Sequence, residues 1–226
     1  MRFDPIAERQ RRGQRTERSG LSKPPIHRPS RRHGETDQHG KHPKLRRMDR
    51  DVKRCLGQMM KGVQVVASTH DGLTRGYCSH WVMQVSFEEP IMLCSISPKH
   101  DTHALIEASG WFTVSNLAGD QVDVGQYFSY PGRKFQYIAP EYLTEVDGLP
   151  VIENCISWLK CDVLEKLDTD LDHDLFLARV SQFGEGRLGE DPLLYSSRHG
   201  WRVAGGKARE PGRSIRDELL ARLEAE

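Results

Sequence analysis

The residues best suited to chemistry lie in a short polar loop between an expected strand and an expected helix. The loop reads Ser97-Pro98-Lys99-His100-Asp101-Thr102. Backbone N–H groups at a helix start bind anions, and the hydroxyls of Ser97 and Thr102 and the charge of Lys99 would strengthen such a site. The loop therefore predicts a phosphate cradle, although any capped helix also carries Ser or Thr at this place.

A second candidate segment comes before this loop. Residues 76–86 read GYCSHWVMQVS, with polar and aromatic side chains where a buried strand would be aliphatic. If this strand neighbours the next one, it places a stacking and hydrogen-bonding wall beside the phosphate loop.

Other chemistries have weaker support. His100 and His103 could share one helical face, but no third ligand follows at a recognised spacing, so no metal site is expected. The sequence has no G-x-S-x-G elbow and no dinucleotide fingerprint. His173, at the edge of the acidic run 168–174, either faces a site or is an ordinary surface histidine. The five cysteines are odd in number and form no C-x-x-C pair, which predicts reduced, packing thiols.

The elements that must position these residues are mostly strands. Hairpin-length links and only short helices predict a mainly β protein with an antiparallel barrel, and they disfavour a βαβ array. A turn is expected at 70–72. Asp101 or Thr102 is expected to cap the first helix, which Gly110 would end. The expected strands cover 62–69, 73–87, 91–97, 111–117, 156–166, 174–183 and 192–203, and the expected short helices cover 103–109 and 120–129.

Charge divides the chain into unlike parts. The whole chain of 226 residues has a net charge of +1, but residues 1–50 carry fifteen Lys and Arg against six Asp and Glu, a net +9. The remainder, with 18 basic against 26 acidic residues, carries −8. We predict a disordered basic tail over 1–50, one folded domain over 51–204, and a linker with an amphipathic C-terminal helix over 205–226.

The tail has two interpretations. It could bind polyanions such as nucleic acid, which is otherwise not an expected partner. Its erratic Arg, His and Pro composition favours the other interpretation, in which translation begins at Met48. The sequence has no membrane-length apolar run and no secretory signal, so a cytoplasmic protein without a membrane partner is expected.

Taken in order, several segments resemble the flavin reductase-like family. They include the phosphate loop and the strand before it, and together they span about Gly62 to Ala204. The resemblance implies an antiparallel Greek-key split β-barrel that binds FMN, with a few short helices. The segments are GVQVVASTHDG (62–72), RGYCSHWVMQVSFEEP (75–90), IMLCSISPKHDTHALIEASG (91–110), WFTVSNLAGDQ (111–121), LDHDLFLARV (171–180) and PLLYSSR (192–198).

The same resemblance implies roles for individual residues. His173 would lie near the nicotinamide or a dimer seam. The expected flavin contacts are Ser79, His80 and Trp81 at the isoalloxazine, Ser97, Lys99 and Thr102 at the phosphate, and Asn116 at the ring or ribityl side.

The implied activity is hydride transfer from NAD(P)H to FMN, or less often FAD, by a reductase component that serves a partner monooxygenase or another electron acceptor. A homodimer is implied as well. The bulky pair His80-Trp81 departs from the small residues of many relatives and bears on how freely a nicotinamide can stack. The alternative is an FMN-binding electron-transfer or binding module without NAD(P)H turnover.

Overall fold

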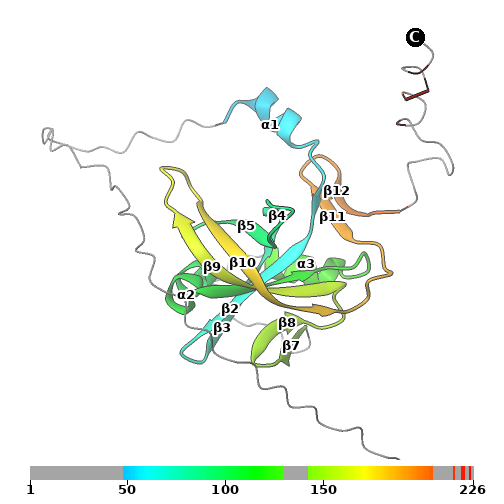
Figure 1. Ribbon diagram of the computed structural model, residues 1–226. Coiled ribbons are helices and arrows are strands. Elements are labelled where there is room, and N and C mark those ends of the chain that lie inside the picture. The colour runs from blue at the N-terminus through cyan, green and yellow to red at the C-terminus, as the bar shows by residue number, and fades with distance from the viewer. Residues whose placement is uncertain (1–47, 130–141, 206–215, 217–219, 222–223, 225–226) are drawn as a thin grey trace, which may run out of the picture. The chain divides into compact units, whose positions relative to one another are not determined.

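The computed structural model describes residues 48–129 and 142–205, with positions 216, 220, 221 and 224. Its main element is a seven-stranded antiparallel sheet that curls into a half-barrel (Figure 1), in the order β3-β2-β6-β9-β10-β5-β4. The predicted mainly β, antiparallel class is therefore confirmed. These strands are β2 (Gln64–His70), β3 (Leu73–Ser79), β4 (Val82–Gln84), β5 (Ile91–Ile96), β6 (Trp111–Asn116), β9 (Ser157–Leu167) and β10 (Asp174–Glu185).

Smaller elements surround this sheet. One further sheet has the order β1-β11-β12, and β7 pairs with β8 in a hairpin. Of the three complete helices within residues 48–129 and 142–205, α2 and α3 had been predicted. The bounds are α1 (Arg50–Leu56), α2 (Asp101–Ser109), α3 (Val122–Ser129), β1 (Lys61–Gly62), β7 (Leu143–Val146), β8 (Leu149–Ile152), β11 (Leu193–Ser196) and β12 (Gly200–Val203).

Strand β2 is buried on both faces over its central residues, which explains the apolar run Val65-Val66-Ala67. Successive side chains of a strand point to opposite faces. Val65 belongs to a core cluster with Phe128 of α3, whereas Val66 belongs to a second cluster with Phe112 and Phe176. The half-barrel thus has two apolar cores that share β2.

The turn between β2 and β3 confirms the predicted hairpin. Asp71 and Gly72 both have positive φ, at 49° and 72°. Two successive residues with positive φ suit the right-handed twist of the flanking strands, and an Asp-Gly pair tolerates them.

Two predicted strands are interrupted. The stretch 73–87 is divided because β3 pairs with β2 at one edge of the sheet, whereas β4 pairs with β5 at the opposite edge. The stretch 192–203 folds back at Gly200, whose φ is 67°, so that β11 and β12 form their own hairpin. Helix α1 and the β7–β8 hairpin were not predicted, because they lie in regions without a regular apolar period.

The buried cysteines agree with the packing interpretation. Cys94 and Cys161 are fully buried in the Phe112 cluster, and burial raises the pKa of each thiol to about 12. Both groups therefore stay protonated and apolar at neutral pH.

The predicted end segments lie mainly beyond the part of the chain that the structure describes. This applies to residues 1–47 and, apart from Leu220, to the apolar stripe of the C-terminal helix. Across the residues that are described, no helix combines the length and apolarity needed to cross a membrane.

Candidate functional site

Three segments meet where β3 passes into β4, β5 passes into α2, and β10 begins. The carbonyl of Trp81 accepts a hydrogen bond from Ser95 N at 3.0 Å, which ties the β3–β4 link to β5. At the end of β5, Ile96 is the register partner of Asp174 in β10. These contacts bring together the segment 79–81, the loop 97–102 and His173, which contain every predicted site residue except Asn116.

The β5–α2 loop forms a compact turn with its hydroxyls turned inward. Ser97 and Thr102 are buried, and Lys99 is exposed. Ser97 Oγ accepts a hydrogen bond from Lys99 N at 3.4 Å, and its carbonyl accepts one from His100 N at 3.0 Å. The loop thus holds a hydroxyl, an ammonium group and a helix start close together.

The N-terminus of α2 differs from the prediction. The cap residue is His100, not Asp101 or Thr102, and its side chain makes no cap hydrogen bond. The His100 ring instead stacks on Tyr77, with ring centroids 4.6 Å apart. The helix start therefore offers backbone N–H groups without a side-chain cap, as an anion site requires. Gly110 ends the helix as predicted, with φ at 76°.

His100 belongs to this site although it was considered only as a metal ligand. Burial, and then the proximity of His173, lower its pKa. Its ring is therefore neutral at pH 7 and adds no positive charge beside Lys99. Its stacking partner, Tyr77, comes from β3 and not from β5, the strand that leads into the loop, so no local sequence signal marks this position.

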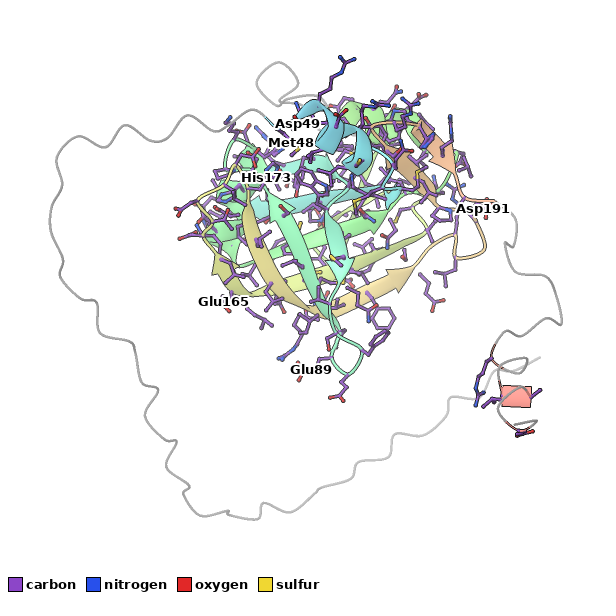
Figure 2. All side chains as sticks on the ribbon, turned by 90° about the horizontal axis from the view of Figure 1, so that it is seen from above. Met48, Asp49, Glu89, Glu165, His173 and Asp191 are labelled. Atoms are coloured by element: carbon purple, nitrogen blue, oxygen red, sulfur yellow. The ribbon has the colours of Figure 1, made fainter. Side chains whose placement is uncertain are left out.

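Trp81 and His173 form an aromatic corner where the β3–β4 link meets the start of β10. Their ring centroids lie 4.7 Å apart in an edge-to-face arrangement, and Trp81 is 50% exposed. His173 Nδ1 lies 3.0 Å from Asp172 Oδ1, and this hydrogen bond is the main cause that lowers the pKa of Asp172. A carboxylate only accepts, so Nδ1 carries the proton and Nε2 remains available. Figure 2 shows His173 at the rim of the barrel.

His80 has a different environment from its neighbour Trp81. Its ring stacks on Tyr195 of β11 at 4.5 Å and meets the edge of Trp201 of β12 at 6.0 Å. Burial lowers the pKa of His80, and Lys61 acts in the same direction. Its Nδ1 is buried and has no hydrogen-bond partner among the described residues. The two bulky residues thus make separate contacts, one with the β11–β12 hairpin and one with the aromatic corner.

Asn116 lies away from the phosphate loop. It is the register partner of Gln64, which in turn pairs with Ser79, so about 10 Å of sheet separates the two site residues. Asn116 Nδ2 donates to Ser157 Oγ at 2.9 Å beside a groove of about 300 Å³ that Gln64 and Glu190 also line. The predicted set is therefore split into seven residues on the three segments that meet, with the His80 ring turned toward β11 and β12, and this flanking position.

The donor set at the loop fits a flavin nucleotide. Its phosphate would need hydroxyl, ammonium and backbone N–H donors, and Ser97, Thr102, Lys99 and the start of α2 provide them. The half-exposed ring of Trp81 offers a flat apolar surface next to this cradle.

Comparison with known proteins agrees with this geometry. The family model described as the flavin reductase like domain matches residues 56–202. The chain belongs to this family. The reductase component of a 4-nitrophenol 4-monooxygenase/4-nitrocatechol 2-monooxygenase from Rhodococcus opacus is 28% identical over 148 residues, 64% of this chain and 76% of that protein.

Two further relatives extend the comparison. An NADH-dependent flavin reductase from a Rhodococcus species is 27% identical, covering 58% of this chain and 74% of its own. The solved structure of the flavin reductase PheA2 in its native state superposes with a TM-score of 0.61 at 26% identity, over 70% of this chain and all of that one. Family membership confirms both the predicted resemblance and the split-barrel fold.

Proposed function

We propose that this protein is a flavin reductase that transfers a hydride from NAD(P)H to FMN and delivers reduced flavin to a separate monooxygenase. The observation that carries this proposal is the uncapped start of α2 beside Ser97, Thr102 and Lys99, which suits a flavin phosphate. Relatives named as an NADH-dependent flavin reductase and as a monooxygenase reductase component support the activity and the kind of partner. FAD, which shares the same phosphate and ring, is the second candidate cofactor.

Each residue group has a distinct task in this proposal. The loop holds the flavin phosphate, and Trp81 packs against the isoalloxazine. His173, held by Asp172, directs Nε2 toward the ring or the nicotinamide and helps to exclude water there. When bound, the flavin supplies the redox chemistry by accepting a hydride, so the protein needs no obligatory acid or base. Asn116 and Ser79 are assigned to the ring or ribityl side of the flavin. His80 packs against Tyr195 and Trp201 and so supports the end of β3, which carries Ser79.

Steady-state oxidation of NADH and NADPH in the presence of added FMN or FAD tests the activity. We expect flavin-dependent consumption of at least one nucleotide, followed as loss of the reduced nicotinamide absorbance. A protein that binds flavin but consumes neither nucleotide would instead be an electron-transfer or binding module.

The proposed homodimer rests on an exposed apolar row at and around β4. Met83 of β4 is exposed, and so are three apolar residues at alternate positions on either side of it: Trp81, Val85 and Phe87, the last in the bend that leads to β5. Strand β4 is an edge of the main sheet, and the β4–β5 turn, which carries Glu89, projects from it in Figure 2. We propose that a second copy covers this row, because the row continues directly from the flavin site.

Phe87→Asp should weaken that dimer by at least tenfold, because it would bury a charge in an apolar contact. Sedimentation equilibrium would measure the dissociation constant. Leu164→Asp, at an exposed apolar site on β9, serves as the control and should leave association unchanged. A monomeric wild type, or a Phe87→Asp variant that still associates with wild-type affinity, would contradict the proposal.

A further inference from the structure

A buried pair joins the two halves of the flavin site, and none of the tasks above uses it. His103 lies in the first turn of α2, directly after Thr102, and it is 5% exposed. Its Nε2 lies 2.9 Å from Asp174 Oδ2, and Asp174 is itself buried and directly follows His173. The pair therefore connects the helix of the phosphate loop to the segment that holds the site histidine.

The surroundings of His103 leave it one arrangement. Its Nδ1 lies 3.3 Å from Glu107 Oε2, one turn along the same helix. Phe176 meets the ring edge-on, with centroids 5.2 Å apart. A ring held by a carboxylate at each nitrogen and by an aromatic neighbour cannot turn without losing all three contacts.

Asp174 is likewise held in its ionised form. Burial would raise its pKa, but the hydrogen bond from His103, a bond from the backbone of Thr169 and the charge of Lys166 outweigh it, so the pKa is below its ordinary value. Lys166 of β9 also contacts Glu107 and Asp168, so its ammonium group lies among three carboxylates. The carboxylate of Asp174 is thus a fixed acceptor at neutral pH.

Strand register places this pair where it can set the position of the phosphate loop. Asp174 faces Ile96, the last residue of β5, after which the chain enters the loop of Ser97 and Lys99. The Thr169 hydroxyl also donates to the carbonyl of His173, which holds that segment from its other side. A shift of α2 relative to β10 would therefore change the distance between the phosphate cradle and the Trp81–His173 corner.

We propose that His103 is a positioning residue for the flavin site. Through its contact with Asp174 it holds the first turn of α2, and with it Thr102 and the preceding Lys99, against the segment that carries His173. This inference rests on the proposed function and deepens it. Flavin affinity would then depend on His103, a buried side chain that does not itself donate to the phosphate.

The test compares variants that separate positioning from packing. His103→Phe keeps an aromatic ring beside Phe176 but removes the donor to Asp174. His103→Gln restores a side-chain N–H donor. Ile106→Val, at a fully buried position of the same helix, removes apolar volume without touching the pair and serves as the control. Each variant is measured for thermal stability, for FMN dissociation by flavin fluorescence, and for kcat and KM for flavin.

We expect His103→Phe to raise the FMN dissociation constant and the flavin KM about tenfold, with a smaller change in kcat. His103→Gln should recover most of that loss, whereas Ile106→Val should lower the melting temperature and leave both constants within about twofold. Asp174→Asn should resemble His103→Phe, and combining the two should add little. If His103→Phe does not fold, the Asp174→Asn and His103→Gln pair carries the same comparison.

Wild-type flavin affinity in both His103→Phe and Asp174→Asn would overturn the positioning role while leaving the proposed function intact. Equal weakening by Ile106→Val would overturn it too, because the effect would then be one of general helix stability. A wild-type protein that bound no flavin would reject the proposed function, and this inference with it.

Discussion

Replacing Lys99 by Glu should raise the dissociation constant for FMN about 100-fold, because a charged donor to a phosphate contributes roughly 1.5–3 kcal/mol and the new carboxylate adds repulsion. Lys99 is exposed at the start of α2, next to the buried hydroxyls of Ser97 and Thr102. The rest of the folded chain carries a net negative charge, so the local cluster must hold the dianion against an unfavourable field. Flavin fluorescence titration would measure the constant, and salt should weaken wild-type binding in the same assay.

Lys53→Glu is the matched control for this reversal. Lys53 is an exposed lysine of α1, and its substitution changes the net charge by the same amount. We expect it to change FMN affinity by less than about threefold, since screened surface charges act weakly at a distance. Equal losses in the two variants would show that overall charge governs binding, and an unchanged Lys99→Glu would show that the phosphate binds elsewhere.

Gly186→Ala should lower the free energy of unfolding by about 3 kcal/mol, because the chain has no room for a side chain there. A Cβ at this position would lie 2.2 Å from the carbonyl oxygen of Cys155 and 3.1 Å from that of Ile156. Those two carbonyls accept hydrogen bonds from Arg187 N and Gly186 N, so relieving the contact would disrupt both bonds. The corresponding fall in melting temperature is about 10 °C for a domain of this size.

Gly189→Ala provides the control for that substitution. Gly189 is exposed, and a Cβ there would meet nothing within 4 Å. Its replacement should change stability by less than about 0.5 kcal/mol. Thermal melts of both variants and the wild type under the same conditions test this prediction. A Gly186→Ala protein with the melting temperature of the wild type would show that the backbone adjusts at little cost in free energy.

Local sequence signals were most reliable where one short segment contains its own explanation. The Asp71-Gly72 turn and Gly110 at the end of α2 both depend on neighbours within a few residues. The predicted N-cap of α2, Asp101 or Thr102, was wrong. The His100 ring at the actual cap position stacks on Tyr77, a residue more than twenty positions earlier in the sequence. The division of 73–87 into β3 and β4 was missed for a related reason, since pairing with β2 or β5 is decided across the sheet.

The candidate site shows the same division. The loop 97–102 and the strand residues 79–81 were identified from their chemistry and the family resemblance, and the structure brings them together with His173. The flanking place of Asn116 and the turning of His80 toward Tyr195 follow from strand register and side-chain direction. The spacing of His100 and His103 could have placed both on one helical face, but their rings have different partners in the fold.

By itself, the sequence determined that the protein is mainly β, that it resembles the flavin reductase-like family, and that residues 97–102 have the composition of a phosphate cradle. Those conclusions need only residue types and their order along the chain. Only the tertiary structure decided that the cradle's helix starts without a side-chain cap, that Trp81 meets His173, and that His103 reaches Asp174. These contacts join residues far apart in sequence, and the register and curl of the sheet decide which of them meet.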